Sequence, residues 1–338
     1  VWTYAGSYPG PTIEAVTGQP IEVKYTNSLP AGTHYLDVDT CAHGPNYWDN
    51  SPRTVPHLHG GHVPARFDGQ PEYDFMPGDF DIYEYPNNQP AATLWYHDHS
   101  LGITRLNAYM GLAGFYLIRD NQEAGLGLPS GEYEIPLVIQ DRQINPDGSL
   151  YYPPALDGNF YGDKILANGK VWPYLNVKQG KYRFRMLNGS SARTYDLKLE
   201  NQAAPGQVIP FSLIGTDGGL IDAPLPLNTF SMAPGERFDV VIDFSGFAPG
   251  TEIILHNDDV TTPLLTDVMK FIVRSEAGFS GPLPPTLQTV TPIPETQAAG
   301  TRRFRLIHEP DNCTPGQWLI ASLDSNGNII GQHWDDIT

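Results

Sequence analysis

Cysteine is scarce in this chain of 338 residues, which contains only Cys41 and Cys313. The two lie far apart in sequence, so their spacing allows a disulfide without establishing one. Apolar runs are short, and none approaches the ~20 residues that a membrane-spanning helix requires. The chain starts with Val-Trp-Thr-Tyr and shows no charged start followed by an apolar core. A signal peptide is therefore either absent or already removed, and no membrane span is predicted.

Basic residues are also few, since 20 Lys and Arg stand against 38 Asp and Glu, for a formal net charge of −18. That balance argues against nucleic acid or an anionic membrane surface as a partner. It suits a soluble protein outside the cytoplasm. Several catalytic motifs are missing as well: G-x-S-x-G, G-x-G-x-x-G after a strand, the P-loop and H-E-x-x-H.

Glycine and proline, in contrast, are abundant, with 34 and 32 residues and no fixed period. Because the hydrophobic fraction of 40% is sufficient for packed cores, we predict a turn-dense, all-β protein. Alternating apolar and polar residues between turn signals mark the strands, and no helix of useful length is predicted. The expected strands include Thr12–Val16, Ile21–Tyr25, Asp81–Pro86, Ala92–His97, Gly111–Asp120, Ile135–Gln140, Lys181–Leu187, Phe211–Ile214, Asp239–Phe244 and Arg302–Ile307.

Connectors divide the chain into blocks, and its length suits two or three domains. Residues 121–131 are polar and Gly-rich, and they end a first β-rich block. A second β-rich block spans about residues 132–275. Residues 278–296 are rich in Pro and Thr and predict an extended linker, after which a new strand begins at Arg302.

Two His-x-His triplets, at His57–His59 and His97–His99, are the main chemical signal in the sequence. On a strand, residues i and i+2 point to the same face, so each triplet directs two imidazoles one way. Imidazole is a good ligand for copper, zinc, iron and nickel. The pairs can converge on one metal or serve two neighbouring ones. The alternative is four hydrogen-bonded core histidines in two adjacent strands, each with a satisfied second nitrogen.

Two aspartates lie close to these pairs in sequence. Asp68 sits in a tight turn, where an aspartate most often caps the turn. The functional alternative is a buried acid that delivers protons near a metal-bound water. Asp98 separates His97 from His99, so its side chain points to the opposite strand face and is interpreted as structural.

Short motifs follow one another along nearly the whole chain. In the first block they are TVPHLHGG at 54–61, DGQPE at 68–72, ATLWYHDH at 92–99, TRLN at 104–107 and GLAG at 111–114. In the second block they are ILANGKVWPY at 165–174, YRFRMLN at 182–188, GTDGG at 215–219 and APGERFD at 233–239. In this order they resemble the multicopper oxidases, nearest to the group of bacterial spore-coat laccases, bilirubin oxidases and phenoxazinone synthases.

The resemblance implies tandem cupredoxin-like Greek-key β-sandwich domains. Residues 1–122 would form a first domain that carries both histidine pairs and lacks its first strand. Residues 123–277 would form a second domain without copper ligands, and residues 278–300 a linker. Residues 301–338 would begin a third domain that is incomplete.

The resemblance also implies four coppers in a complete protein. A type 1 copper takes electrons from a small reducing substrate, and a trinuclear cluster passes them to dioxygen, which is reduced to water. By motif, His57 resembles the type 2 ligand, and His59, His97 and His99 resemble type 3 ligands. Asp68 resembles the acid near the solvent channel of the cluster. Substrates across the family include phenols, aromatic amines, bilirubin and ferrous ion, and a secreted, cell-envelope or spore-coat location is expected.

Two later motifs of the family, H-x-x-H-x-H and His-Cys-His, are missing, and neither cysteine has flanking histidines. Type 1 ligands are therefore not expected in this chain. We expect roughly the first two-thirds of a three-domain oxidase, whose remaining C-terminal region acts as a partner. We also expect that the 338-residue polypeptide alone is inactive as an oxidase.

Two other classes of function remain open at this stage. A copper-free cupredoxin relative with an interaction role is one, although such a protein need not keep all four histidines. A copper-binding or carrier module is the other, and it predicts tightly bound copper without the intense blue band of a type 1 thiolate centre. Copper analysis of the purified protein distinguishes these alternatives.

Overall fold

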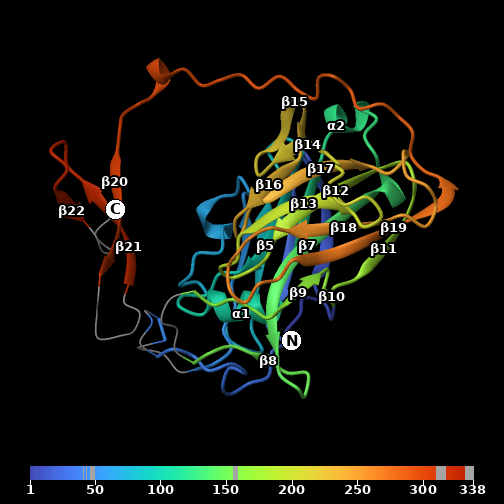
Figure 1. Ribbon diagram of the computed structural model, residues 1–338. Coiled ribbons are helices and arrows are strands. Elements are labelled where there is room, and N and C mark those ends of the chain that lie inside the picture. Colours follow the sequence, from blue (N-terminus) through green and yellow to red (C-terminus); the bar gives the residue numbers. More distant parts are fainter. Residues whose placement is uncertain (41, 43, 46–49, 155–158, 310–316, 332–338) are drawn as a thin grey trace.

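Strands dominate the computed structural model, which describes residues 1–40, 42, 44–45, 50–154, 159–309 and 317–331 (Figure 1). Cys41 and Cys313, and with them any disulfide between the two, lie outside the described residues. Within the described ranges, no helix has the length and apolar character needed to cross a bilayer. The predicted all-β class is confirmed.

The first block contains a four-stranded sheet in the order β1-β6-β5-β3 and a two-stranded sheet of β2 and β4. Strand β5 is buried along its whole length because its two faces pack against different neighbours. One face joins a core of tyrosines and aliphatic residues, among them Tyr83, Tyr85 and Tyr116. The strands are β1 (Gly10–Val16), β2 (Ile21–Thr26), β3 (Pro56–His59), β4 (Phe80–Tyr85), β5 (Ala92–Asp98) and β6 (Ala113–Arg119).

Two short helices depart from the expectation that the chain has no useful helix. Helix α1 (Thr104–Met110) buries Leu106, Tyr109 and Met110, and it ends at Gly111, whose φ of 123° breaks the helical path. Helix α2 (Asn121–Gly125) lies in the predicted connector, and Asp120 caps it by accepting a hydrogen bond from the amide of Glu123. Both helices span too few residues for a helical period to appear in the sequence. Single 3-10 turns cover Ala65–Phe67, Gly131–Tyr133 and Glu295–Gln297.

The second block packs two larger sheets around one apolar core. The core includes Phe184, Phe211, Phe244 and Phe271. One sheet has the order β10-β9-β7-β12-β17-β14-β15 with β8 paired to β7, and the other has the order β11-β19-β18-β13-β16. The strands are β7 (Glu134–Ile144), β8 (Leu150–Tyr151), β9 (Lys164–Ala167), β10 (Lys170–Val171), β11 (Tyr174–Gln179), β12 (Lys181–Asn188), β13 (Tyr195–Asn201), β14 (Phe211–Thr216), β15 (Gly219–Leu227), β16 (Thr229–Met232), β17 (Arg237–Asp243), β18 (Glu252–Asn257) and β19 (Asp267–Ala277).

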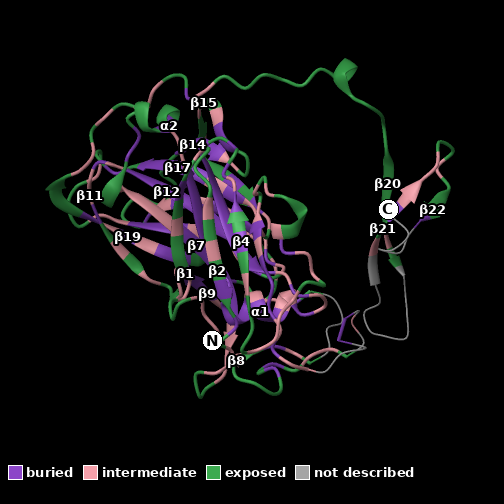
Figure 2. Cartoon of the chain, turned by 180° about the vertical axis from the view of Figure 1, so that it is seen from behind, coloured by how far each residue is buried: buried purple, intermediate pink, exposed green. Residues whose placement is uncertain are grey.

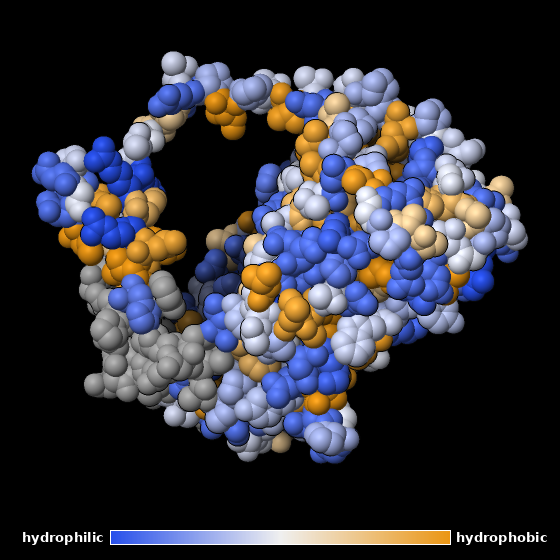
Figure 3. All heavy atoms as spheres, viewed as in Figure 1, coloured by the Kyte–Doolittle hydropathy of each residue, from blue (hydrophilic) through white to orange (hydrophobic). Residues whose placement is uncertain are grey.

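A small antiparallel sheet follows residues 278–302, which contain no strand. It consists of β20 (Arg303–Glu309), β21 (Gln317–Leu323) and β22 (Ile329–Gly331). The connecting segment is largely exposed and the sheet stands apart from the main body (Figure 2). Apolar side chains, including exposed Phe304 and Leu306, gather on this sheet (Figure 3). Among the described residues, no strand of one block pairs with a strand of another. The exact domain boundaries stay predictions.

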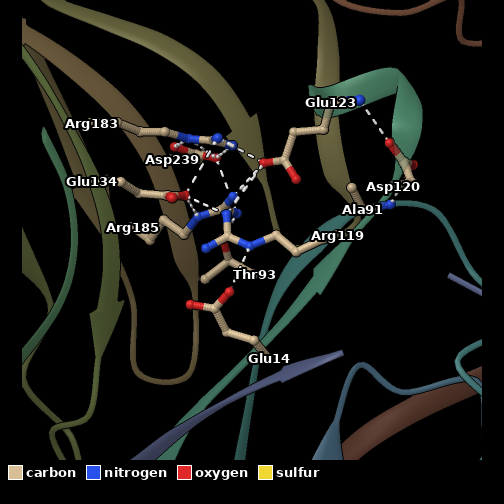
Figure 4. A network of polar contacts seen from close by, with 10 residues as sticks. All are labelled: Glu14, Ala91, Thr93, Arg119, Asp120, Glu123, Glu134, Arg183, Arg185 and Asp239. Carbon is tan, nitrogen blue, oxygen red and sulfur yellow. Dashed lines mark hydrogen bonds and ion pairs between the residues drawn. The ribbon is translucent and has the colours of Figure 1, made fainter. Parts of the chain in front are cut away.

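The first and second blocks meet through an apolar contact and a buried polar network. Trp95 and Phe115 of the first block pack with Val138 and Leu187 of the second. Beside them, three arginines and three carboxylates from both blocks interlock (Figure 4). This network consists of Arg119, Glu123, Glu134, Arg183, Arg185 and Asp239.

Glu134 makes folding stability depend on pH. Burial alone would raise its pKa, but the hydrogen bond from Arg119 and the charges of Arg185 and Arg183 outweigh burial and lower the pKa to about 2. A lowered folded-state pKa stabilises the fold above the ordinary value of 4.5, and this contribution is lost as pH falls from 4.5 towards 2. We expect Glu134→Gln to reduce the slope of the unfolding free energy in this window by up to ~1.4 kcal/mol per pH unit.

Urea unfolding at several pH values between 5 and 2.5 measures this slope. Glu22→Gln serves as the control, because Glu22 is an exposed carboxylate on β2 and its replacement should leave the slope unchanged. Parallel curves for Glu134→Gln and the parent chain would contradict the expectation.

Candidate metal centre

The two histidine pairs lie on neighbouring strands. Strands β3 and β5 run antiparallel with His57 opposite His97 and His59 opposite Trp95. His99 lies one residue beyond the end of β5, where its amide donates to the carbonyl of Val55 at 2.8 Å. Residues that alternate along paired strands share a face, so this register brings all four imidazoles to one side of the sheet.

The imidazoles form one compact cluster. One ring nitrogen from each of His57, His59 and His97 lies within 4.8 Å of the others. Nδ1 of His59 is 3.3 Å from Nε2 of His97. The ring of His99 is centred 5.0 Å from that of His57 and 5.8 Å from that of His97. The structure therefore brings together all four residues that the sequence singled out.

Main-chain carbonyls orient two of the rings. Nδ1 of His57 donates to the carbonyl of Asp68, and Nδ1 of His97 donates to the carbonyl of Asp98 at 2.7 Å. A ring whose Nδ1 carries the proton presents Nε2 as its free ligand nitrogen. Two nitrogens lie ~3.3 Å apart when each is ~2.0–2.1 Å from one shared ion and the nitrogen–ion–nitrogen angle is tetrahedral. The spacing of His59 and His97 fits this requirement, so the donor set suits a metal such as copper.

Burial favours the neutral form of His59, His97 and His99, which is the form that metal binding needs. Burial and then the nearby charge of Arg237 lower the pKa of His59 to about 4. Burial also lowers the pKa of His97 to about 3, although the hydrogen bond to Asp98 opposes the shift. The pKa of His99 is lowered by burial as well. At neutral pH these three side chains therefore need not lose a proton before a metal ion binds.

Asp68 lies beside the cluster. Its carboxylate Oδ1 is 3.5 Å from Nδ1 of His57, in addition to the carbonyl contact described above. Gly69 allows this approach, because a Cβ at that position would lie 2.3 Å from the carbonyl oxygen of Pro56. Its φ of 73° also favours glycine. The turn therefore places an acid against the first histidine pair.

The second block covers one end of the cluster although it provides none of the four histidines. The indole of Trp95, from the first block, stacks on His59 with ring centres 5.1 Å apart. Gly235 of the second block lies over both rings, because a Cβ there would be 3.7 Å from each. Arg237 follows two residues later, at the start of β17. Its guanidinium donates to the carbonyls of Thr93, Gly235 and Asp217. These contacts fix the loop over His59.

Sequence reasoning did not assign a role to Trp95, Gly235 or Arg237. Both motifs that contain them, ATLWYHDH and APGERFD, were visible in the sequence as points of resemblance. Nothing in either motif indicates that a loop of the second block packs on the histidines. That contact depends on how the two blocks dock.

Comparisons with known proteins agree with this geometry. A sequence model of the family described as "Multicopper oxidase" matches residues 1–50 and 45–123. A laccase from Bacillus stratosphericus is 44% identical over 340 residues, which covers 92% of this chain and 65% of that protein. A laccase from Bacillus subtilis strain 168 is 44% identical over 301 residues, which covers 81% of this chain and 57% of that protein.

A solved structure supports the same relationship. McoA multicopper oxidase from the hyperthermophile Aquifex aeolicus superposes with a TM-score of 0.76 and 32% identity, over 88% of this chain and 62% of that one. The chain thus spans less than two thirds of the length of each of these relatives. Copper is the cofactor that these relationships imply. The order of motifs, the shared fold and the sequence identity together show that this chain belongs to the multicopper oxidase family.

Proposed function

We propose that this chain provides part of the copper centre of a laccase-type oxidase. Such an enzyme couples one-electron oxidation of a phenolic or related small substrate to the four-electron reduction of dioxygen to water. One observation carries the proposal: two His-x-His pairs on adjacent strands present four imidazoles on one sheet face. This arrangement supports multinuclear copper binding more strongly than four separately hydrogen-bonded core histidines.

Within this proposal, His57 binds the type 2 copper, and His59, His97 and His99 bind type 3 coppers. The clustering of these rings and the close approach of His59 to His97 support the assignment. The chain then contributes half of the trinuclear ligands. The other half of the ligands, and the type 1 site, belong to a C-terminal region that completes the enzyme. That region acts as the partner of this chain.

Copper, when bound, supplies one-electron redox chemistry. The chain's own residues prepare the site for it. The carbonyls of Asp68 and Asp98 hold Nδ1 protons and so direct Nε2 of His57 and His97 outward. Trp95 covers one face of the His59 ring. The carboxylate of Asp68 is placed to pass protons towards dioxygen as it is reduced.

The proposed partners are dioxygen and a small reducing substrate, whether a phenol, an aromatic amine, a bilirubin-like molecule or a metal ion. Two relatives that carry the name laccase support phenol oxidation among these. The net charge of −18 supports a location outside the cytoplasm.

Removing one central imidazole should disrupt copper binding. We expect His97→Ala to weaken copper binding by about 100-fold, because the ring lies 3.3 Å from His59 and presents Nε2 to the shared ion. Copper titration against a chromophoric chelator measures the change. His256→Ala is the matched control, since His256 lies on β18 of the second block and pairs there with acidic residues.

Oxygen uptake with a phenol as electron donor, measured on the copper-loaded full-length protein, tests the oxidase itself. Uptake that His97→Ala abolishes and His256→Ala leaves intact would support the proposal. Tightly bound copper without oxygen uptake would favour a copper carrier, and a protein that binds no copper would favour an interaction role.

A further inference from the structure

Asp98 separates the two histidines of the second pair, and its side chain lies on the opposite face of β5 from the imidazoles. The residue is fully buried. Its carboxylate accepts hydrogen bonds from the hydroxyls of Thr54 (2.8 Å) and Ser100 (3.3 Å) and from the amides of Val55 and Ser100 (both 3.1 Å). A fifth comes from Nδ2 of Asn107 at 2.8 Å. The expectation that Asp98 is structural therefore understates its position, because these donors come from the segments that flank both histidine pairs.

The carboxylate ties one histidine pair to the other. Thr54 and Val55 lie immediately before β3, which carries the first pair, and Asp98 lies at the end of β5, which carries the second. The amide of His99 adds a main-chain bond to Val55 at 2.8 Å. At the same residue, the carbonyl of Asp98 orients the ring of His97. A change in the Asp98 side chain would therefore shift both pairs relative to each other.

Asn107, on α1, holds the Asp98 side chain in place. Its buried Nδ2 donates to Asp98 and also to the carbonyl of Arg53 at 2.9 Å. Its Oδ1 lies 3.0 Å from Nε2 of His34. The amide of Leu36 donates to Nδ1 of His34, so the proton of that ring lies on Nε2 and points at Asn107. Every polar atom of the Asn107 side chain is thus engaged, and the residue can adopt a single orientation.

We propose that Asp98 and Asn107 are positioning residues of the metal centre. Together they hold the two histidine pairs at the separation that a shared metal ion requires, from the face of the sheet that the metal does not touch. Metal sites need ligands held within ~0.5 Å of the productive geometry, and rings near a strand end do not reach that precision unaided. This inference rests on the proposed function, since it assumes that the histidines bind copper.

Copper binding to isosteric variants of the full chain tests the proposal. Asp98→Asn keeps the shape of the side chain but removes its charge. Thr54→Val removes one donor to Asp98, and Thr54→Ser restores it. Tyr116→Phe is the control, because Tyr116 lies on β6 of the same block and the change removes its buried hydrogen bond to Asn87. The readouts are Cu(II) affinity, measured against a chromophoric chelator, the Cu(II) electron paramagnetic resonance spectrum, and the thermal midpoint of the copper-free chain.

We expect Asp98→Asn to weaken Cu(II) binding by about tenfold or more and to change the spectrum. Thr54→Val should act in the same direction to a smaller extent, and Thr54→Ser should resemble the parent. Tyr116→Phe should lower the thermal midpoint and leave both copper readouts unchanged. If Asp98→Asn does not fold, the two Thr54 variants decide the question.

The outcomes separate this inference from the function on which it rests. A parent chain that binds no Cu(II) would overturn both. A parent that binds Cu(II), with folded Asp98→Asn and Thr54→Val variants that match it in affinity and spectrum, would overturn the inference alone.

Discussion

Arg185→Met should destabilise the folded chain by about 3–5 kcal/mol, which is a large share of the stability of an ordinary domain. The guanidinium is almost completely buried, and it donates to Glu134 at 2.5 Å, to Thr93 at 2.9 Å and to Glu123. Methionine fills a similar volume but offers no charge or donor. Two buried carboxylates would then lose a cation, and an uncompensated buried charge is costly.

Urea unfolding of the copper-free chain measures this loss. Lys178→Met is the matched control, since Lys178 pairs with Glu132 at the protein surface and its loss should not shift the unfolding midpoint detectably. The network joins both blocks, because Arg119 belongs to the first, Glu123 lies on α2 in the connector, and the other members belong to the second. Arg185 also donates to Thr93 of the first block. An unchanged midpoint for Arg185→Met would show that the network does not hold the blocks together.

Asp68→Asn should lower oxygen uptake by the copper-loaded oxidase by about 100-fold or more, while copper content stays the same. A positioned general acid contributes ~10²–10⁴-fold to a reaction that consumes protons. Asparagine keeps the size of the side chain and the main-chain carbonyl that orients His57, so the site itself should survive. Only the proton-carrying carboxylate beside His57 is lost.

Oxygen uptake and metal analysis on the same samples test this expectation. Glu72→Gln is the control, because Glu72 is an exposed carboxylate in the same turn region and should not alter the rate. If Asp68→Asn retains the full rate, Asp68 serves as a turn-capping residue only, the alternative that the sequence left open.

Strands and helices were not equally predictable from the sequence. Alternation in Ile21–Thr26 and the apolar run in Ala92–Asp98 indicate strands because a strand repeats every two residues, and both are present. Helix α1 was missed because its seven residues give fewer than two complete turns. The end of β5 at Asp98 was not predictable either, since strand ends depend on which neighbour continues the ladder.

For the metal centre too, some features were predictable from the sequence and others were not. The four histidines, their two-residue spacing and the chemistry that four imidazoles offer can be read from the sequence, because these are local properties. The fold alone determines that β3 and β5 pair with His57 opposite His97, and that Gly235 lies over His59 with Arg237 bound to its carbonyl. It also determines that Asp98 and Asn107 join the two pairs from behind. Such contacts link residues far apart in sequence, and strand register and block docking, which no local pattern contains, determine them.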